Sequence, residues 1–177
     1  MSEMLEAGIR ASAMVVALKD AGVSHFVTVP DFVQLALHQA VERGEGNMAL
    51  VRACNEDQAV CTSAGLTIAG GRPLIVVQNQ GFYACINSLR AVGLDARIPS
   101  VFLIGQFGRE HDNYGHPATS SRRRVVSLLE PLLETLGVPY WQLESESDLT
   151  AVDEAFEAAR ARGGPAALVV GRPITWH

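Results

Sequence analysis

Short aliphatic runs and longer mixed segments alternate along the whole chain. The short runs predict strands at 25–29, 48–51, 74–77, 101–104, 140–143 and 166–170. The longer segments, bounded by capping and stop residues, predict helices at 3–21, 32–42, 55–68, 82–92, 122–136 and 148–162. A polar stretch at 105–121 interrupts this alternation, and loops of that length in a compact domain usually carry function.

Repeated strand–helix units are typical of a parallel sheet with helices on both faces. We expect an α/β fold, a doubly wound sheet of about six strands, in a single domain spanning residues 1–177. Ligand sites in such sheets lie beyond the carboxyl ends of the strands. Function is therefore expected in the segments that follow the strands, at 30–31, 53–56, 78–82, 105–116 and 171–173.

Composition narrows the class of protein. The chain has 177 residues, with 14 basic and 19 acidic side chains and a net charge of −5, which argues against nucleic-acid binding. No apolar run approaches the roughly 20 residues needed to cross a bilayer, and the first residues lack the pattern of a signal peptide. We expect a cytoplasmic protein that binds neither nucleic acid nor membranes.

Common catalytic motifs are missing from the sequence. There is no GxGxxG after a strand, no GxxxxGK[ST], no GxSxG and no HExxH. Three cysteines without CxxC spacing predict reduced, buried thiols in place of disulfides or a zinc site. His111 and His116 have no cysteine nearby in sequence, so we expect no metal ligands from this chain.

The segment Cys54-Asn55-Glu56-Asp57-Gln58 places an acid where a strand ends and a helix begins. An acidic residue at a helix N-terminus is commonplace, because the helix dipole favours it. The helix that follows is rich in Ala and Gly, which lets it pack closely on the sheet or on a second subunit. The next strand ends in Gln78-Asn79-Gln80-Gly81-Phe82, and such amides are costly to bury unless they face a cleft or a partner.

These two segments together read NExxAVxxxAGxxxAGGRPxxVxQNxG, followed by INSL. The pattern resembles the pyrimidine-binding domain of thiamine diphosphate enzymes. More narrowly, it is similar to the α subunit of sulfopyruvate decarboxylase and to the N-terminal domain of phosphonopyruvate decarboxylase. The resemblance runs from about residue 5 to about residue 175 and implies the same fold.

The resemblance implies a role for Glu56, which matches the glutamate that hydrogen-bonds N1′ of the aminopyrimidine ring. That contact favours the imino tautomer, whose exocyclic nitrogen removes the C2 proton of the thiazolium. Such chemistry requires a carboxyl group held out of water, so that it keeps a proton available. The further residues that match the cofactor-binding segments are Pro30, Gln78, Asn79, Gly81 and Phe82.

The polar loop matches the substrate-facing loop of the family. By this resemblance His116, and also His111, would relay a proton after carbon dioxide leaves. Arg109 and Asn79, with His116, would bind the 2-oxo acid substrate. The alternative is a solvated loop with two bystander histidines.

Thiamine diphosphate enzymes hold the diphosphate through Mg²⁺ with a GDG motif and a later Asn, and this chain has no GDG. The resemblance therefore implies half of a split 2-oxo acid decarboxylase. A separate β subunit would carry the diphosphate-binding domain and the Mg²⁺, in an α2β2 or larger hetero-oligomer. The alternatives are the same half-subunit in a carboligase or aldehyde-forming lyase, and a non-catalytic scaffold subunit of the same fold.

Overall fold

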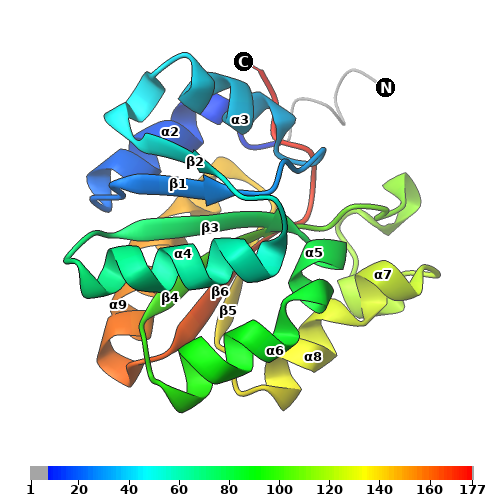
Figure 1. Ribbon diagram of the computed structural model, residues 1–177. Coiled ribbons are helices and arrows are strands. Elements are labelled where there is room, and N and C mark those ends of the chain that lie inside the picture. Colours follow the sequence, from blue (N-terminus) through cyan, green and yellow to red (C-terminus); the bar gives the residue numbers. More distant parts are fainter. Residues whose placement is uncertain (1–7, 177) are drawn as a thin grey trace.

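The computed structural model describes residues 8–176 and contains a sheet of six strands, all parallel (Figure 1). The strand order across the sheet is β2-β1-β3-β4-β6-β5. Their bounds are β1 His25–Thr28, β2 Ala49–Arg52, β3 Pro73–Gln78, β4 Ser100–Gly105, β5 Tyr140–Leu143 and β6 Pro165–Val170. All six lie where the aliphatic runs predict them, which confirms the expected α/β fold.

Helices cover both faces of this sheet. On one face lie α2 (Ala11–Asp20), α3 (Leu35–Glu42) and α9 (Ala151–Arg162). On the other lie α4 (Glu56–Ile68), α5 (Asn79–Ala84), α6 (Ile86–Ser88) and α8 (Leu129–Thr135), with a π-helical segment at Leu89–Asp95. The short helix α7 (Arg124–Ser127) precedes α8, and 3-10 turns occur at Glu45–Asn47, His111–Asn113, Ala118–Ser120 and Glu146–Thr150.

The central strands divide the core into two layers. Along β3, Leu74 and Val76 belong to the core under α2, α3 and α9. Ile75 and Val77 belong to the core under α4 and α5. All four side chains are fully buried, because successive residues of a strand point to opposite faces. The continuous aliphatic runs are therefore those of strands covered on both sides.

Several predicted helix boundaries were wrong. Within the described residues the first predicted helix is α-helical only from Ala11, since residues 8–10 run beside Thr175 and Arg10 pairs with it as a bridge. Residues 3–7 of that prediction lie outside the described part. The second helix begins at Leu35, because the Asp31 carboxylate accepts the N–H of Val33 and holds a turn ahead of it.

Two predicted helices are broken into pieces. The segment 82–92 is divided between α5, α6 and the π-helical segment, which meet around Cys85 and Leu89. The segment 122–136 is divided into α7 and α8 at Leu128. The last helix begins as a 3-10 turn, and its α-helical part starts at Ala151.

Candidate active site

The strand order creates a topological switch point at the carboxyl edge of the sheet, between β1 and β3. The chain leaves β1 toward α3 on one face, and it leaves β3 toward α5 on the other. Doubly wound sheets bind ligands where neighbouring strands diverge in this way. The turn at 29–31 lies on one side of this switch point, with Pro30 exposed, and Gln78 lies half-buried on the other. Both segments were predicted to line the site.

Glu56 begins α4 at the same edge, directly after the loop that follows β2. The Asn55 side chain accepts the N–H of Gln58 at 2.8 Å, and the Gln58 side chain accepts the N–H of Cys54 at 2.7 Å. These reciprocal bonds are those of a capping box shifted by one residue. They fix the first turn of the helix, so the backbone of Glu56 is held firmly although its side chain is free to contact a ligand.

The Glu56 carboxylate lies over the backbone of α5 at Gly81. A Cβ atom on Gly81 would come within 2.6 Å of the Glu56 Cδ, so the carboxylate occupies the space where any other residue would have a side chain. Asp57 is different, because its Oδ1 accepts the hydroxyl of Ser88 at 2.5 Å. Within residues 8–176, the Glu56 side chain has no hydrogen bond or ion pair. The structure thus presents a half-buried carboxylate, without a partner among these residues, at the carboxyl edge of the sheet.

Asp31 forms a second acidic position, in the turn at 30–31 where function is expected from the sequence, although the sequence alone does not single it out. Its carboxylate is 1% exposed and occupies the space beside Gly105 where a side chain would lie. Gln34 donates to it at 2.7 Å, and the N–H of Val33 donates at 2.8 Å. Burial raises the pKa of the Asp31 carboxyl. The backbone N–H of Asp31 donates in turn to Nε2 of buried His38.

Helix α5 connects the carboxyl edge of the sheet to the long loop. Asn79 is fully buried, and its amide donates to the carbonyls of Phe107 at 3.0 Å and Val125 at 2.7 Å. The Tyr83 hydroxyl donates to the same Val125 carbonyl. Phe82 packs edge-on against Phe102 in the core. Asn79 therefore fixes the loop to α5, and Phe82 anchors α5 in the core. The contact of either residue with a cofactor stays a prediction.

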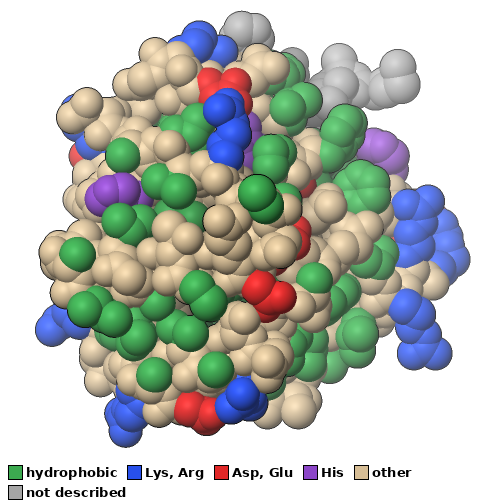
Figure 2. All heavy atoms as spheres, in the orientation of Figure 1, with side chains coloured by type: hydrophobic (Ala, Val, Ile, Leu, Met, Phe, Trp, Pro, Cys, Tyr) green, Lys and Arg blue, Asp and Glu red, His purple; other side chains and the backbone are tan. Residues whose placement is uncertain are grey.

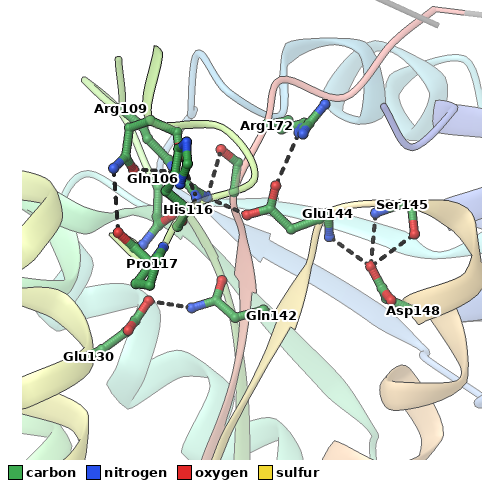
Figure 3. Close-up of polar contacts among 12 residues, drawn as sticks. Gln106, Arg109, His116, Pro117, Glu130, Gln142, Glu144, Ser145, Asp148 and Arg172 are labelled. Atoms are coloured by element: carbon green, nitrogen blue, oxygen red, sulfur yellow. Dashed lines mark hydrogen bonds and ion pairs between the residues drawn. The ribbon is translucent and has the colours of Figure 1, made fainter. Parts of the chain in front are cut away.

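Arg109 is the centre of the loop's internal hydrogen bonds (Figure 3). Its guanidinium pairs with Glu144 and donates to the carbonyl of His116 at 2.8 Å and to the side chain of Asn113 at 2.9 Å. Glu144 also binds Arg172 at 3.0 Å, so one carboxylate joins the loop to the ends of β5 and β6. The Arg109 side chain is only 3% exposed. Arg109 therefore holds the loop together through these bonds. Because its side chain is buried, the predicted contact with substrate would require a different loop conformation.

Both loop histidines are exposed. His111 packs edge-on against Tyr114 with ring centroids 5.3 Å apart. The His116 carbonyl accepts a hydrogen bond from Arg109, and His116 lines a polar hollow with Glu110 and Arg122. Their exposure leaves the rings accessible, and their proton-relay role stays a prediction.

Two aromatic residues at this edge were not found from the sequence. Phe32, 70% exposed, and Phe107, 38% exposed, contact each other edge-on at 6.3 Å. Phe32 follows β1 and Phe107 follows β4, so the pair spans the carboxyl ends on either side of β3. Exposed aromatic residues are typical of contact surfaces. The sequence signal that could have identified them is their position directly after two predicted strands.

The outward side of α4 carries small and apolar residues. Cys61, Gly65 and Ile68 follow one another at helical spacing and are exposed, Ile68 by 74%. Figure 2 shows few charged side chains over this helix. The prediction that the cysteines are buried is confirmed for Cys85 and wrong for Cys54 and Cys61, because both of these face outward.

Within residues 8–176, no helix has the length and apolar character of a membrane span. No cluster of three metal-ligating side chains is found in the same part of the chain.

Comparison with known proteins supports the fold. No family model matches the sequence, and no curated protein matches it. Among solved structures, the chain is similar to 2-oxoglutarate:ferredoxin oxidoreductase from Magnetococcus marinus, solved with 2-oxoglutarate, coenzyme A and succinyl-CoA bound. The TM-score is 0.69 at 15% sequence identity, over 92% of this chain. The chain spans 28% of the length of that protein, so the likeness concerns one part of a larger enzyme.

Proposed function

We propose that this chain is the pyrimidine-binding subunit of a thiamine diphosphate-dependent enzyme that decarboxylates a 2-oxo acid. The observation that carries the proposal is the unpaired Glu56 carboxylate lying over Gly81 at the switch point of the sheet. The motif around these residues supports it, because the same pattern marks the cofactor glutamate in the family that the sequence resembles. The solved neighbour supports the substrate class, since its name and its bound ligand identify a 2-oxo acid.

The residues at the switch point fit one contact of an aminopyrimidine ring. Glu56 would offer a carboxyl oxygen to the ring nitrogen N1′, and the absence of a side chain on Gly81 leaves the space that this carboxylate occupies. When bound, thiamine diphosphate would supply the carbon nucleophile and the electron sink for decarboxylation. Glu56 would hold and return the proton at N1′, and the first turn of α4 keeps its backbone in place.

We further propose that a second subunit completes the site. The Mg²⁺ and the diphosphate would be bound by that subunit, in a hetero-oligomer. Two exposed surfaces support a partner: the small and apolar residues on the outward side of α4, and the aromatic pair Phe32–Phe107 at the carboxyl edge of the sheet. Exposed aromatic side chains of this kind are enriched at protein interfaces.

The test is to isolate the chain natively and identify what co-purifies by mass spectrometry. We expect a partner of similar size that carries GDG with a downstream Asn, together with thiamine diphosphate and Mg²⁺. The complex should release carbon dioxide from one member of a panel of 2-oxo acids. A chain that emerges alone, without cofactor or activity, favours the scaffold subunit instead.

The neighbour's name favours a second candidate, an oxidoreductase subunit that uses the same glutamate. In that case carbon dioxide release from the 2-oxo acid would require an added electron acceptor and coenzyme A. A simple decarboxylase would need neither, so the same assay with and without these additions distinguishes the two.

A further inference from the structure

Phe32 and Phe107 form an exposed aromatic pair at the same edge of the sheet as the proposed cofactor glutamate. Their rings lie edge-on with centroids 6.3 Å apart, and their exposed fractions are 70% and 38%. Phe32 is in the turn after β1 and Phe107 follows β4, and these are the two strands that neighbour β3. The pair therefore lies across the end of β3, beside the switch point where ligands of such folds bind.

A buried acid brings the two rings together. The Asp31 carboxylate and the Val33 side chain occupy the space beside Gly105 where a side chain on that glycine would lie. Gly105 is the last residue of β4, so this packing places the turn that contains Phe32 next to Phe107. The N–H of Val33 donates to the Asp31 carboxylate at 2.8 Å and fixes the turn. The position of Phe32 is thus set by contacts within the chain, before any ligand binds.

Phe107 is connected to the proposed cofactor glutamate through α5. Its carbonyl accepts a hydrogen bond at 3.0 Å from the side chain of Asn79, the first residue of that helix. Two residues further along the helix, Gly81 leaves the space that the Glu56 carboxylate occupies. Phe107 and Glu56 therefore contact the same short helix. A substrate that reacts next to Glu56 would lie beside this helix, and so close to the aromatic pair.

The two arginines packed inside the long loop offer no free charge to a substrate. Arg109 and Arg172 both pair with Glu144, and the Arg109 side chain is 3% exposed (Figure 3). Arg123 donates to the Gly108 carbonyl at 2.9 Å, directly after Phe107, and has no ion pair within residues 8–176. A cation in this position suits the carboxylate that every 2-oxo acid has. A second anionic group placed against the rings would lose its hydration without gaining a partner, which is costly.

We propose that Phe32 and Phe107 bind the side chain of the substrate, which is a 2-oxo acid with an aromatic or aliphatic side chain and a single carboxylate. The inference rests on the proposed function and narrows its substrate class. The rings are exposed in the chain alone. In the complex, the partner that completes the site would close over them and bury them together with the substrate side chain. An aromatic substrate would gain edge-to-face or offset contacts with the two rings.

The test uses the natively isolated complex with a set of 2-oxo acids, each assayed with and without an electron acceptor and coenzyme A. Phenylpyruvate has an aromatic side chain and 2-oxopentanoate an aliphatic one. 2-Oxoglutarate is the anionic match of 2-oxopentanoate, because a carboxylate replaces the terminal methyl group. We expect kcat/KM to be about 10–100-fold higher for phenylpyruvate than for 2-oxoglutarate, with 2-oxopentanoate between them.

Two variants test the pair itself. Phe32→Ala and Phe107→Ala should each lower kcat/KM for phenylpyruvate by about tenfold. Each should leave kcat/KM for pyruvate nearly unchanged, because a methyl group buries little surface against the rings. The ratio of the two substrates does not depend on how much of a variant folds or assembles, so a merely structural role would not change it. Val16→Ala, at a 56% exposed position of α2, is the control and should leave both values unchanged.

The outcomes separate this inference from the proposed function. A preference for 2-oxoglutarate, or an unchanged ratio of phenylpyruvate to pyruvate in F32A and F107A, would overturn the inference while the proposed function stands. Absence of carbon dioxide release from every 2-oxo acid under both conditions would overturn the proposed function, and the inference with it.

Discussion

The Glu56 carboxylate occupies the space where a side chain on Gly81 would lie. The Cδ of Glu56 is 2.6 Å from the position of a Cβ on Gly81, although the two residues are 25 positions apart in the sequence. The glycine of α5 and the acid of α4 are therefore matched to each other. The proposed chemistry depends on this packing, because the Glu56 carboxylate can take its position only while residue 81 has no side chain.

Gly81→Ala should separate activity from stability. The new methyl group displaces the Glu56 carboxylate, and misplacement of a catalytic group by about 1 Å can lower turnover by a factor on the order of 10². Stability of the isolated chain should hold, because alanine is favoured over glycine in a helix by about 1 kcal/mol and the Glu56 side chain can move aside. Turnover of the assembled enzyme and the melting temperature of the chain are the two measurements.

The matched control is Gly65→Ala in α4. A Cβ there meets nothing within 4 Å, so the isolated chain should gain up to about 1 kcal/mol of stability. If G81A lowered the melting temperature strongly while G65A raised it, the loss of activity would reflect unfolding and not the displacement of Glu56.

Glu144→Gln should loosen the loop at residues 106–121. Glu144 is the carboxylate partner of the buried Arg109, and it also binds Arg172. Removing one partner of a buried ion pair leaves an uncompensated charge, and we expect a loss of about 3 kcal/mol in the free energy of unfolding. Urea unfolding measures this loss, and hydrogen exchange should show faster exchange in the loop.

Glu146→Gln is the control for that substitution. Glu146 binds Arg10 at the surface, and such exposed pairs contribute only about 0–1 kcal/mol. Equal losses in E144Q and E146Q would show that the Arg109–Glu144 pair does not hold the loop.

His38 should make stability depend on pH between about 4 and 6.5. Burial lowers the pKa of His38 in the folded chain to about 4, while the unfolded value stays near 6.5. Over this interval the unfolded state binds the extra proton, so the free energy of unfolding falls as the pH falls, by about 3 kcal/mol for the whole interval. Urea unfolding at several pH values should show this slope in the wild type and a flatter profile in His38→Gln. Parallel profiles would contradict the assignment.

The isolated chain should bind thiamine diphosphate weakly, with a dissociation constant above about 0.1 mM. Only the pyrimidine side of the proposed site belongs to this chain, and the Mg²⁺ ligands would come from the partner. Calorimetry with and without Mg²⁺ measures this directly. Tight, Mg²⁺-dependent binding to the chain alone would contradict the proposal of a split site.

The strands could be predicted from the sequence because buried parallel strands are continuous aliphatic runs, as at Leu74–Val77. The interruptions at Cys85 and Leu128 could not, since the flanking segments still have helical composition and only tertiary packing divides them. The position of Glu56 at a strand–helix junction was visible, but its contact with Gly81 joins two separate helices, α4 and α5. The same holds for Arg109, whose partner Glu144 lies 35 residues away. Local patterns contain no information about such pairings.

The most direct test of the account compares Glu56→Gln with Asp57→Asn in the natively isolated complex. The two acids are neighbours in the first turn of α4, but Asp57 is hydrogen-bonded to Ser88, whereas Glu56 has no partner among the described residues. Carbon dioxide release from the preferred 2-oxo acid should fall by a factor on the order of 10²–10⁴ in E56Q, as expected for loss of an acid–base group. It should change little in D57N. Unchanged turnover in E56Q would contradict the catalytic role of this chain.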